Sequence, residues 1–230
     1  MNKIAMEKKC SEHKNTKIEY FQKGDNPVWL LYSGTHGNEA GVIGSIEKFL
    51  QENEDRFPNF LWVPAVSPSA VALGTRENSE GLDTNRIFFD TTKNEEVIAN
   101  LNIVRGKHFE YFLDFHEDPT VTKSFYIYDS AGVRDEMMVE ILRKQKELGI
   151  LLWHGFDDEE DPKLGFWVEE GYANAVRITE DSGFTGDYLL TKGIVKKRAW
   201  TFEVPGLEEQ AKKNIVVKNI FETYLKFLNI

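Results

Sequence analysis

The chain has 230 residues, of which 41% are hydrophobic and 29% charged, a composition typical of a soluble globular protein with its own core. Its formal charge of −10 argues against a nucleic acid partner, because phosphate binding requires a basic surface. No apolar run approaches the roughly 20 residues that span a bilayer, and residues 1–20 lack the apolar centre of a signal peptide. With a single cysteine, Cys10, the chain fits a reducing compartment. We therefore expect a cytoplasmic protein that binds neither nucleic acid nor membrane.

Residues 1–16 are polar, and we expect them to form a flexible N-terminal segment ahead of one domain at residues 17–230. Apolar, β-rich runs within that domain predict strands at residues 28–32, 60–66, 111–115, 125–128, 176–179 and 198–202. Near-continuous apolar runs of this length are typical of strands that are covered on both faces.

Helix-like runs alternate with these strands, at residues 38–51, 95–105, 135–148 and 207–228. The last run carries an apolar face that should close the core. Such alternation predicts an α/β sandwich around a mixed, largely parallel sheet. The acidic run DDEED, residues 157–161, we interpret as a solvated loop.

The turn after the first predicted strand reads SGTHGNEAG, residues 33–41, and contains His36 and Glu39. Its glycines allow the backbone to turn sharply. Zinc in hydrolases is typically held by three protein ligands, often two histidines and one glutamate, and these two residues would supply two of them. By itself the pair could equally mark a helix start, with Glu39 stabilised by the helix dipole. A metal site therefore requires a third ligand at another strand end.

The segment YFLDFHED, residues 111–118, places His116 directly after an apolar run. Sites in open α/β sheets gather at the carboxyl ends of strands, and both His36 and His116 fit that rule. The other histidines lack either the strand-end position or a partner motif: His13, His108 and His154. We therefore predict His116 as the third ligand.

The segment RAWTFEVPG, residues 198–206, presents Glu203 at the end of another predicted strand. A carboxylate there is costly unless it is solvated, paired or part of a site. In a site it could take and return a proton of the attacking water, as hydrolysis requires. The alternative is a strand-end residue that faces water.

The segment GTRENSEGLDTNRIF, residues 74–88, contains Arg76, Asp83, Asn85 and Arg86. Arginine side chains bind carboxylates through two parallel hydrogen bonds. Asp83 could accept a hydrogen bond from the second nitrogen of a ligand histidine and so fix its tautomer. The alternative is a polar surface loop.

The motifs HGNE, GTREN…DTNR, DFHED and TFEVPG, in this order, resemble those of the zinc carboxypeptidase superfamily. That superfamily includes the aspartoacylase and succinylglutamate desuccinylase branch, and the resemblance covers residues 28–206. It implies a three-layer α/β/α sandwich for a catalytic domain at residues 17–230, with one Zn²⁺ per chain. By this resemblance His36, Glu39 and His116 hold the zinc.

The same resemblance assigns the remaining roles. Glu203 would be the general base and acid, and Asp83 would orient His36. Arg76 would polarise the scissile carbonyl and stabilise the oxyanion. Asn85 and Arg86 would grip a carboxylate of the substrate.

The chain also departs from the family pattern in three places. Thr84 stands where leucine is usual, and Ser67 where asparagine is usual. Neither Tyr172 nor Tyr188 falls at the place of the tyrosine that precedes the catalytic glutamate in the peptidases. We therefore assign no tyrosine to the site.

The two branches of the superfamily imply different substrates. SGTHGNE and NRIF resemble the acylases, whereas GTREN, FHED and TFEVPG resemble the peptidases. Typical acylases add a further domain after the catalytic glutamate, and residues 207–230 account for about one helix. We favour carboxypeptidase-type cleavage of a small peptide with a free carboxylate, with an N-acyl amino acid deacylase as the alternative.

A rival of another class is a non-catalytic metal- or ligand-binding protein on the same scaffold, because a fold alone does not establish function. The glycine-containing segment 165–195 is where we expect the specificity pocket. The motifs do not indicate an oligomeric state.

Overall fold

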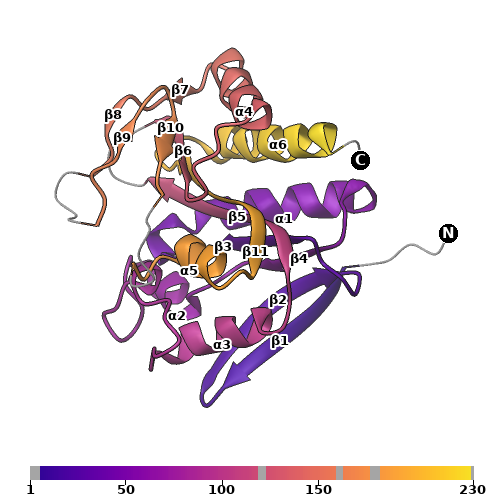
Figure 1. The fold of residues 1–230 in the computed structure, drawn as a ribbon, viewed down its shortest axis with the longest axis vertical. Helices are drawn as coiled ribbons and strands as arrows, with labels where there is room; N and C mark the ends of the chain where they lie inside the picture. Colours follow the sequence, from indigo (N-terminus) through magenta and orange to yellow (C-terminus); the bar gives the residue numbers. More distant parts are fainter. Residues whose placement is uncertain (1–5, 119–122, 159–162, 177–181, 229–230) are drawn as a thin grey trace.

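The computed structural model describes residues 6–118, 123–158, 163–176 and 182–228. Within these ranges a nine-stranded sheet runs in the order β1-β2-β4-β3-β5-β11-β6-β10, and β7 pairs with β6 (Figure 1). Its strands are β1 (Glu7–His13), β2 (Thr16–Lys23), β3 (Trp29–Ser33), β4 (Phe60–Val63), β5 (Phe109–Asp118), β6 (Ser124–Asp129), β7 (Leu151–Leu152), β10 (Tyr172–Asn174) and β11 (Val195–Pro205). A separate two-stranded ladder joins β8 (Gly155–Phe156) to β9 (Trp167–Val168).

The helices are α1 (Gly41–Asn53), α2 (Pro68–Leu73), α3 (Glu95–Val104), α4 (Glu136–Glu147), α5 (Thr185–Thr191) and α6 (Gln210–Phe227). Short 3₁₀ turns lie at η1 (Gly37–Glu39), η2 (Glu54–Arg56) and η3 (Thr84–Arg86). Side chains cap α3 and α4 at their starts, where Asn94 accepts from the amide of Val97 and Asp135 from that of Met138. No helix in the described ranges combines the length and the apolar character needed to cross a bilayer.

The centre of the sheet is parallel, because β4, β3, β5 and β11 all run in the same direction. β11 then pairs antiparallel with β6, and the β1–β2 hairpin pairs antiparallel with β4. The predicted mixed, largely parallel sheet is confirmed. Its parallel centre brings the carboxyl ends of β3, β5 and β11 to the same edge.

Helices cover both faces of this sheet. Along β3, Trp29 and Leu31 belong to the cluster that includes α1, α4 and α6, whereas Leu30 and Tyr32 belong to the cluster that includes α3 and α5. Alternation along a strand sends successive side chains to opposite faces. Both faces are therefore buried, which explains the unbroken apolar run and confirms the three-layer α/β/α sandwich.

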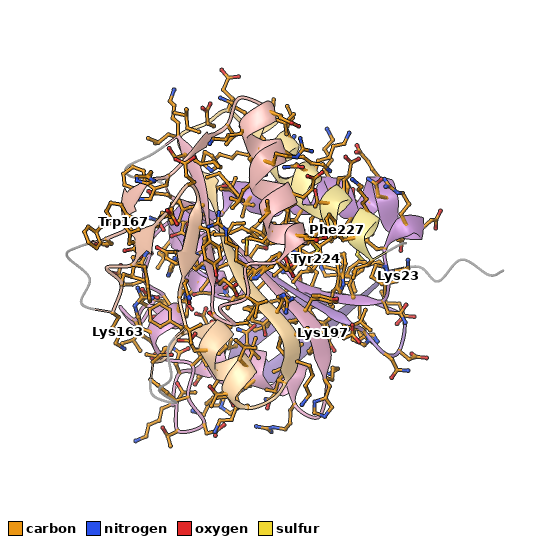
Figure 2. All side chains as sticks on the ribbon, turned by 45° about the horizontal axis from the view of Figure 1, so that its top comes forward. Lys23, Lys163, Trp167, Lys197, Tyr224 and Phe227 are labelled. Atoms are coloured by element: carbon orange, nitrogen blue, oxygen red, sulfur yellow. The ribbon has the colours of Figure 1, made fainter. Side chains whose placement is uncertain are left out.

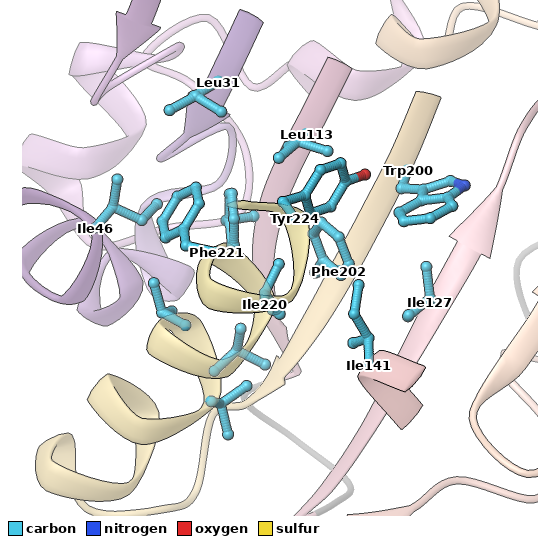
Figure 3. Packing of buried hydrophobic residues seen from close by; sticks show 14 of the residues in the cluster. Leu31, Ile46, Leu113, Ile127, Ile141, Trp200, Phe202, Ile220, Phe221 and Tyr224 are labelled. Carbon is cyan, nitrogen blue, oxygen red and sulfur yellow. The ribbon is translucent and has the colours of Figure 1, made fainter. Parts of the chain in front are cut away.

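The layer between α6 and the sheet is rich in aromatic rings. Figure 3 shows Phe221 and Tyr224 of α6 facing Leu113 of β5 and Phe202 of β11. The ring of Tyr224 lies 5.4 Å from that of Trp29 and 5.5 Å from that of Trp200. Burial of each such side chain contributes on the order of 1.5–3 kcal/mol, so this layer holds the central strands firmly.

One expectation about the N-terminus is wrong. Residues Glu7–His13, expected in a flexible segment, form β1, which pairs with β2 from Glu7↔Gln22 to His13↔Thr16. The boundary placed after residue 16 therefore falls inside β2, just after the turn of the hairpin. β1 escaped detection because an edge strand with one face in water has no apolar run. Its Ser11 side chain donates to the carbonyl of Ala99 on α3, 2.8 Å away.

Other elements differ in detail. Of the strand expected at residues 176–179, positions 177–179 lie outside the described ranges, and the nearby strand is β10. The short helices α2 and α5 were not anticipated, because six or seven residues are too few to show helical periodicity.

Candidate metal centre and active site

Three side chains converge at the carboxyl edge of the sheet: His36, Glu39 and His116. Each offers one ligand atom, and the three atoms lie within 4.8 Å of one another. His36 and Glu39 follow β3, whereas His116 is in β5, the parallel neighbour of β3. All three residues are buried, with at most 4% of their surface exposed. The sequence prediction that these residues meet at two neighbouring strand ends therefore agrees with the geometry.

The backbone after β3 makes this approach possible. Gly34 has φ +60°, a conformation that strains other residues. At Gly37, a Cβ atom would overlap the carbonyl of Ala70 in α2, so only glycine allows the turn to lie this close to that helix. These two glycines bring the His36–Glu39 turn over the end of β5.

Glu39 lies between the two imidazoles. Its Oε1 is 2.7 Å from Nδ1 of His36, and its Oε2 is 2.7 Å from Nδ1 of His116. Two ring nitrogens and one carboxylate thus face a common point. This donor set is the one that holds zinc in many hydrolases, where a fourth position stays open for water. The residues present therefore fit a divalent cation.

The charges of the cluster support that fit. Burial lowers the pKa of His36, but Glu39 and Asp83 outweigh burial and leave this pKa raised. For His116, burial is likewise outweighed by Asp114 and Glu39, so its pKa lies well above the ordinary value. Burial raises the pKa of Glu39, yet the two histidines shift it strongly downward. The site therefore favours positive charge, which a bound cation would supply in place of protons.

A second carboxylate stands behind each histidine. Asp83 Oδ1 lies 3.0 Å from Nε2 of His36, and Asp114 Oδ2 lies 3.2 Å from Nε2 of His116. Carboxylates in this place orient ligand histidines and increase their basicity. Asp83 was identified from the sequence, whereas Asp114 was missed. Its signal was present: Asp114 lies two residues before His116 in a strand, and hence on the same face.

Glu203 lies next to this cluster. In the parallel pairing of β11 with β5 it stands opposite His116, and in the antiparallel pairing with β6 it stands opposite Tyr126. Burial raises the pKa of Glu203 to about 8; Glu39 and Asp118 also raise it, while the histidines lower it. A carboxyl group with this pKa can both accept and return a proton near neutral pH.

The loop between α2 and η3 brings a guanidinium group to the cluster. Nη1 of Arg76 lies 3.6 Å from Oε1 of Glu39, and Nη2 lies 2.9 Å from Oδ2 of Asp83. Burial lowers the pKa of Arg76, but the charges of Asp83 and Glu39 outweigh burial and leave this pKa raised. The guanidinium group therefore stays charged. It can therefore stabilise negative charge that develops beside the metal cluster.

Asn85 and Arg86 follow in η3. Oδ1 of Asn85 accepts from the backbone and the hydroxyl of Thr185, at 3.0 and 3.1 Å, so its Nδ2 group is the donor that it can offer a ligand. The guanidinium of Arg86 lies 4.1 Å from the ring centre of Phe184 and 3.9 Å from Asp83 Oδ2. Stacking of this kind fixes the orientation of the planar guanidinium group.

A cavity of about 900 Å³ joins these groups. Its lining includes the three cluster residues and Glu203, with Arg76, Asn85 and Arg86. We expected the specificity pocket at residues 165–195; among the described residues of that segment, Phe184 and Gly186 line the cavity. Further lining comes from residues that sequence reasoning did not assign to the site, at positions 126, 128, 153–158 and 164. The strand and loop positions of these residues gave no local motif that could have identified them.

Asp157 and Asp158 belong to the acidic run that we interpreted as a solvated loop. Both lie in a loop, as expected, with Asp157 half-buried and Asp158 exposed, but they also line the cavity; residues 159–161 lie outside the described ranges. The tyrosines that we declined to assign lie elsewhere. Tyr172 donates to Asp129 and Tyr188 to Asp90, and neither is among the residues that line the cavity.

Beside the cluster, Glu117 pairs with Lys213 of α6, with Oε2 and Nζ 2.9 Å apart. Both residues are buried, and the backbone amide of Glu117 lies 3.4 Å from Glu39 Oε2. Removing one partner of such a buried ion pair costs several kcal/mol. The pair therefore ties α6 to the edge of the sheet at which the cluster lies.

Comparison with known proteins gives structural relatives only. No family model matches the chain, and no curated protein matches it by sequence. A protein from Shewanella baltica, provisionally named a metallopeptidase, superposes with a TM-score of 0.76 at 19% identity, covering 98% of this chain and 87% of that one.

A metallo-carboxypeptidase from Burkholderia cenocepacia has a TM-score of 0.68 at 12% identity, over 96% of this chain and 65% of that one. An aspartoacylase family protein from Mesorhizobium loti has a TM-score of 0.60 at 19% identity, over 95% of this chain and 66% of that one. Both branches that the motifs resemble are thus represented among similar structures. The chain has the fold shared by these metallopeptidase, carboxypeptidase and aspartoacylase family structures.

Proposed function

We propose that the chain is a zinc-dependent hydrolase that cleaves an amide bond next to a free carboxylate. The observation that carries this proposal is the convergence of His36, Glu39 and His116 at one point beside Glu203. These three ligands would hold one zinc ion. When bound, zinc would supply a Lewis acid that lowers the pKa of water and offsets negative charge on the scissile carbonyl oxygen.

Glu203 is the general base and acid in this proposal. Its raised pKa, about 8, makes the carboxylate a ready proton acceptor, and a cation in the cluster would lower that pKa toward neutrality. Glu203 takes a proton from the attacking water and returns it to the leaving amine. Arg76, held beside Glu39 and Asp83, stabilises the oxyanion.

Asn85 and Arg86 bind the carboxylate of the substrate. Arg86, stacked on Phe184, offers guanidinium N–H groups, and Asn85 offers its Nδ2 group. Binding of the carboxylate fixes the position of the amide bond relative to Glu203. The reacting groups are then already oriented and need not meet by a random encounter. The cavity volume of about 900 Å³ has room for a short peptide.

A hydrolysis screen tests the proposal. Zinc-loaded protein is incubated, with and without chelator, with short peptides and with N-acetyl and N-succinyl amino acids, and products are identified by mass spectrometry. We expect chelator-sensitive release of a C-terminal residue from peptides. Cleavage of the N-acyl compounds alone would instead support the deacylase alternative. Metal binding without any cleavage would favour a binding protein on this scaffold.

A further inference from the structure

A buried hydroxyl joins the loop of the site to the turn that carries His36. The side chain of Thr84, in η3, donates to the carbonyl of Thr35 over 2.8 Å, and both residues are only 1% exposed. The accepting carbonyl belongs to the peptide bond that precedes His36. A buried carbonyl that loses its donor cannot turn to water, so this bond resists displacement of either segment. The leucine that is usual at this position in the family that the motifs resemble has no group that could donate it.

The two neighbours of Thr84 in the chain act on different parts of the site. Oδ1 of Asp83 lies 3.0 Å from Nε2 of His36, whereas Asn85 lines the cavity. The same Oδ1 accepts from the backbone amide of Asn85 over 2.8 Å, so the three consecutive residues form one compact turn. Such a turn moves as a unit. A shift of Thr84 would therefore displace both Asp83 and Asn85 relative to the metal cluster.

Other hydrogen bonds hold this region at different points. The amide of Gly37 donates to the carbonyl of Thr75 over 2.7 Å, which fixes the loop one residue before Arg76. Oδ1 of Asn85 accepts from Thr185, which connects η3 to α5 and not to the turn that follows β3. Neither bond therefore replaces the one from Thr84.

The bond from Thr84 also differs in kind from the contact between Asp83 and His36. That contact joins two titratable groups, and its strength depends on whether the imidazole carries a proton. A hydroxyl and a carbonyl keep their hydrogen bond in every protonation state of the site. The bond from Thr84 can therefore hold η3 in place while a bound cation takes the place of protons in the cluster.

We propose that Thr84 is a positioning residue, which sets the place of η3 relative to the metal cluster. Through Asp83 it orients His36, and through Asn85 it places the carboxylate of the substrate. The first part depends only on the cluster, whereas the second rests on the proposed function. Thr84 is not a catalytic residue, because its hydroxyl donates to Thr35 and it is not among the residues that line the cavity.

The zinc affinity of two variants tests the first part without turnover. Thr84→Val keeps the branched shape but loses the hydroxyl, whereas Thr84→Ser keeps the hydroxyl and loses a methyl group. In competition with a chelator, we expect Thr84→Val to bind zinc about three- to tenfold more weakly, and Thr84→Ser to stay within about twofold of the unaltered protein. An unchanged zinc affinity in folded Thr84→Val, or an equal loss in both variants, would overturn the inference.

Steady-state kinetics at saturating zinc, on a substrate found by the screen, test the second part. Thr84→Val should raise KM by about fivefold and leave kcat within about threefold, because the bond from Gly37 to Thr75 still fixes the loop near Arg76. Thr84→Ser should restore KM. An unchanged KM in Thr84→Val, with or without a fall in kcat, would overturn the placement of the carboxylate by Thr84.

Thr223→Val is the matched control for a general loss of stability. Thr223 is fully buried in α6, next to Tyr224, which is labelled in Figure 2. Its hydroxyl accepts from Nζ of Lys144 over 3.1 Å and donates to Asn219, so this variant also loses hydrogen bonds of a buried threonine, but outside the lining of the cavity. Thermal melting should show a loss of stability in both valine variants, whereas zinc affinity should fall only in Thr84→Val. An equal fall in both would assign the effect to stability and overturn the inference.

The outcomes separate this inference from the proposed function. A zinc affinity that falls in Thr84→Val and returns in Thr84→Ser, with no cleavage by the unaltered protein, would sustain the positioning of the cluster and refute the hydrolase proposal. Chelator-sensitive cleavage by the unaltered protein, with equal zinc affinity in all variants, would refute the positioning role and leave the hydrolase proposal intact.

Discussion

The site combines residues fixed at strand ends with residues carried by a loop, and the two groups are held differently. His36, Glu39 and His116 are almost fully buried and contact one another at 2.7 Å. The side chain of Arg76, on the loop, is 40% exposed. The three cluster residues therefore lie buried at strand ends, whereas Arg76 reaches them from a partly exposed loop.

Asp83 is the point of attachment. Its carboxylate contacts Nε2 of His36 at 3.0 Å, Nη2 of Arg76 at 2.9 Å and the amide of Asn85 at 2.8 Å. Histidine and arginine hold its pKa well below the ordinary range despite burial, so the carboxylate stays charged. One side chain therefore links the strand-end residues to the loop residues, and substitutions on either side of it should have separable effects.

The largest expected effect is that of Glu203→Gln, a substitution at a strand end. The amide cannot accept the proton of the attacking water, so kcat should fall by about 10²–10⁴. The bound zinc should remain, because Glu203 is not one of the three ligands. Kinetics and metal analysis on one preparation measure both, with Glu209→Gln, at an exposed position, as the control. Undiminished turnover would refute the role of Glu203.

On the loop side, Arg76→Met should lower kcat by about 10²–10³ while leaving zinc content unchanged, since one oxyanion donor is lost. Arg134→Met, which removes an arginine paired at the surface with Glu169, is the matched control. If only KM rose in the Arg76 variant, Arg76 would serve substrate binding and not the transition state.

Asp83→Asn tests the link between the two groups. The variant removes a carboxylate from His36 and a charge partner from Arg76, so zinc affinity should fall by about 10–100-fold and KM should rise. Competition with a chelator reports the affinity, and steady-state kinetics report KM. A change in only one of the two quantities would show that the groups are held independently.

The smallest expected effect is a dependence of zinc affinity on pH, which arises from the two histidines of the cluster. The pKa values of His36 and His116 are raised in the metal-free protein, so zinc must displace protons. Affinity should therefore rise about tenfold per displaced proton per pH unit, until pH exceeds those pKa values. Calorimetry in buffers of different ionisation enthalpy counts the protons, and a release of none would contradict the scheme.

The same raised pKa values set the sign of a stability change. A histidine whose pKa is higher folded than unfolded contributes stability that is complete below about pH 6.5 and is lost as pH rises through the folded pKa. The metal-free protein should thus become less stable above neutral pH, and zinc should reverse the trend. Thermal melting across pH, with and without zinc, measures both.

Sequence patterns predicted the central strands and the polar residues at their ends better than the edge strand β1 and the loops. β3, β5 and β11 are covered on both faces, so their apolar runs stand out, and a polar residue at the end of such a run is conspicuous. β1 has one face in water and gave no such signal. Loop residues such as Arg76 follow no apolar run, and their individual roles were assigned only through the family resemblance.

The contact between Tyr128 and Asp157 in the cavity could not be predicted, because the two residues are distant in the chain. Asp157 reads locally as one member of a charge run, but in the structure it lines the cavity and accepts a hydrogen bond from Tyr128. Asp114 is a different case, since its position two residues before His116 in a strand was sufficient to place it beside that histidine.

Metal content of the purified protein tests the central claim most directly. Native mass spectrometry after zinc loading and dialysis compares the unaltered chain with a His36→Gln/His116→Gln double variant. His154→Gln is the control, because His154 lines the cavity without belonging to the cluster. We predict one zinc ion per chain in the unaltered and control proteins and none in the double variant. Equal zinc content in all three, or no zinc in any, would contradict a metal centre at His36, Glu39 and His116.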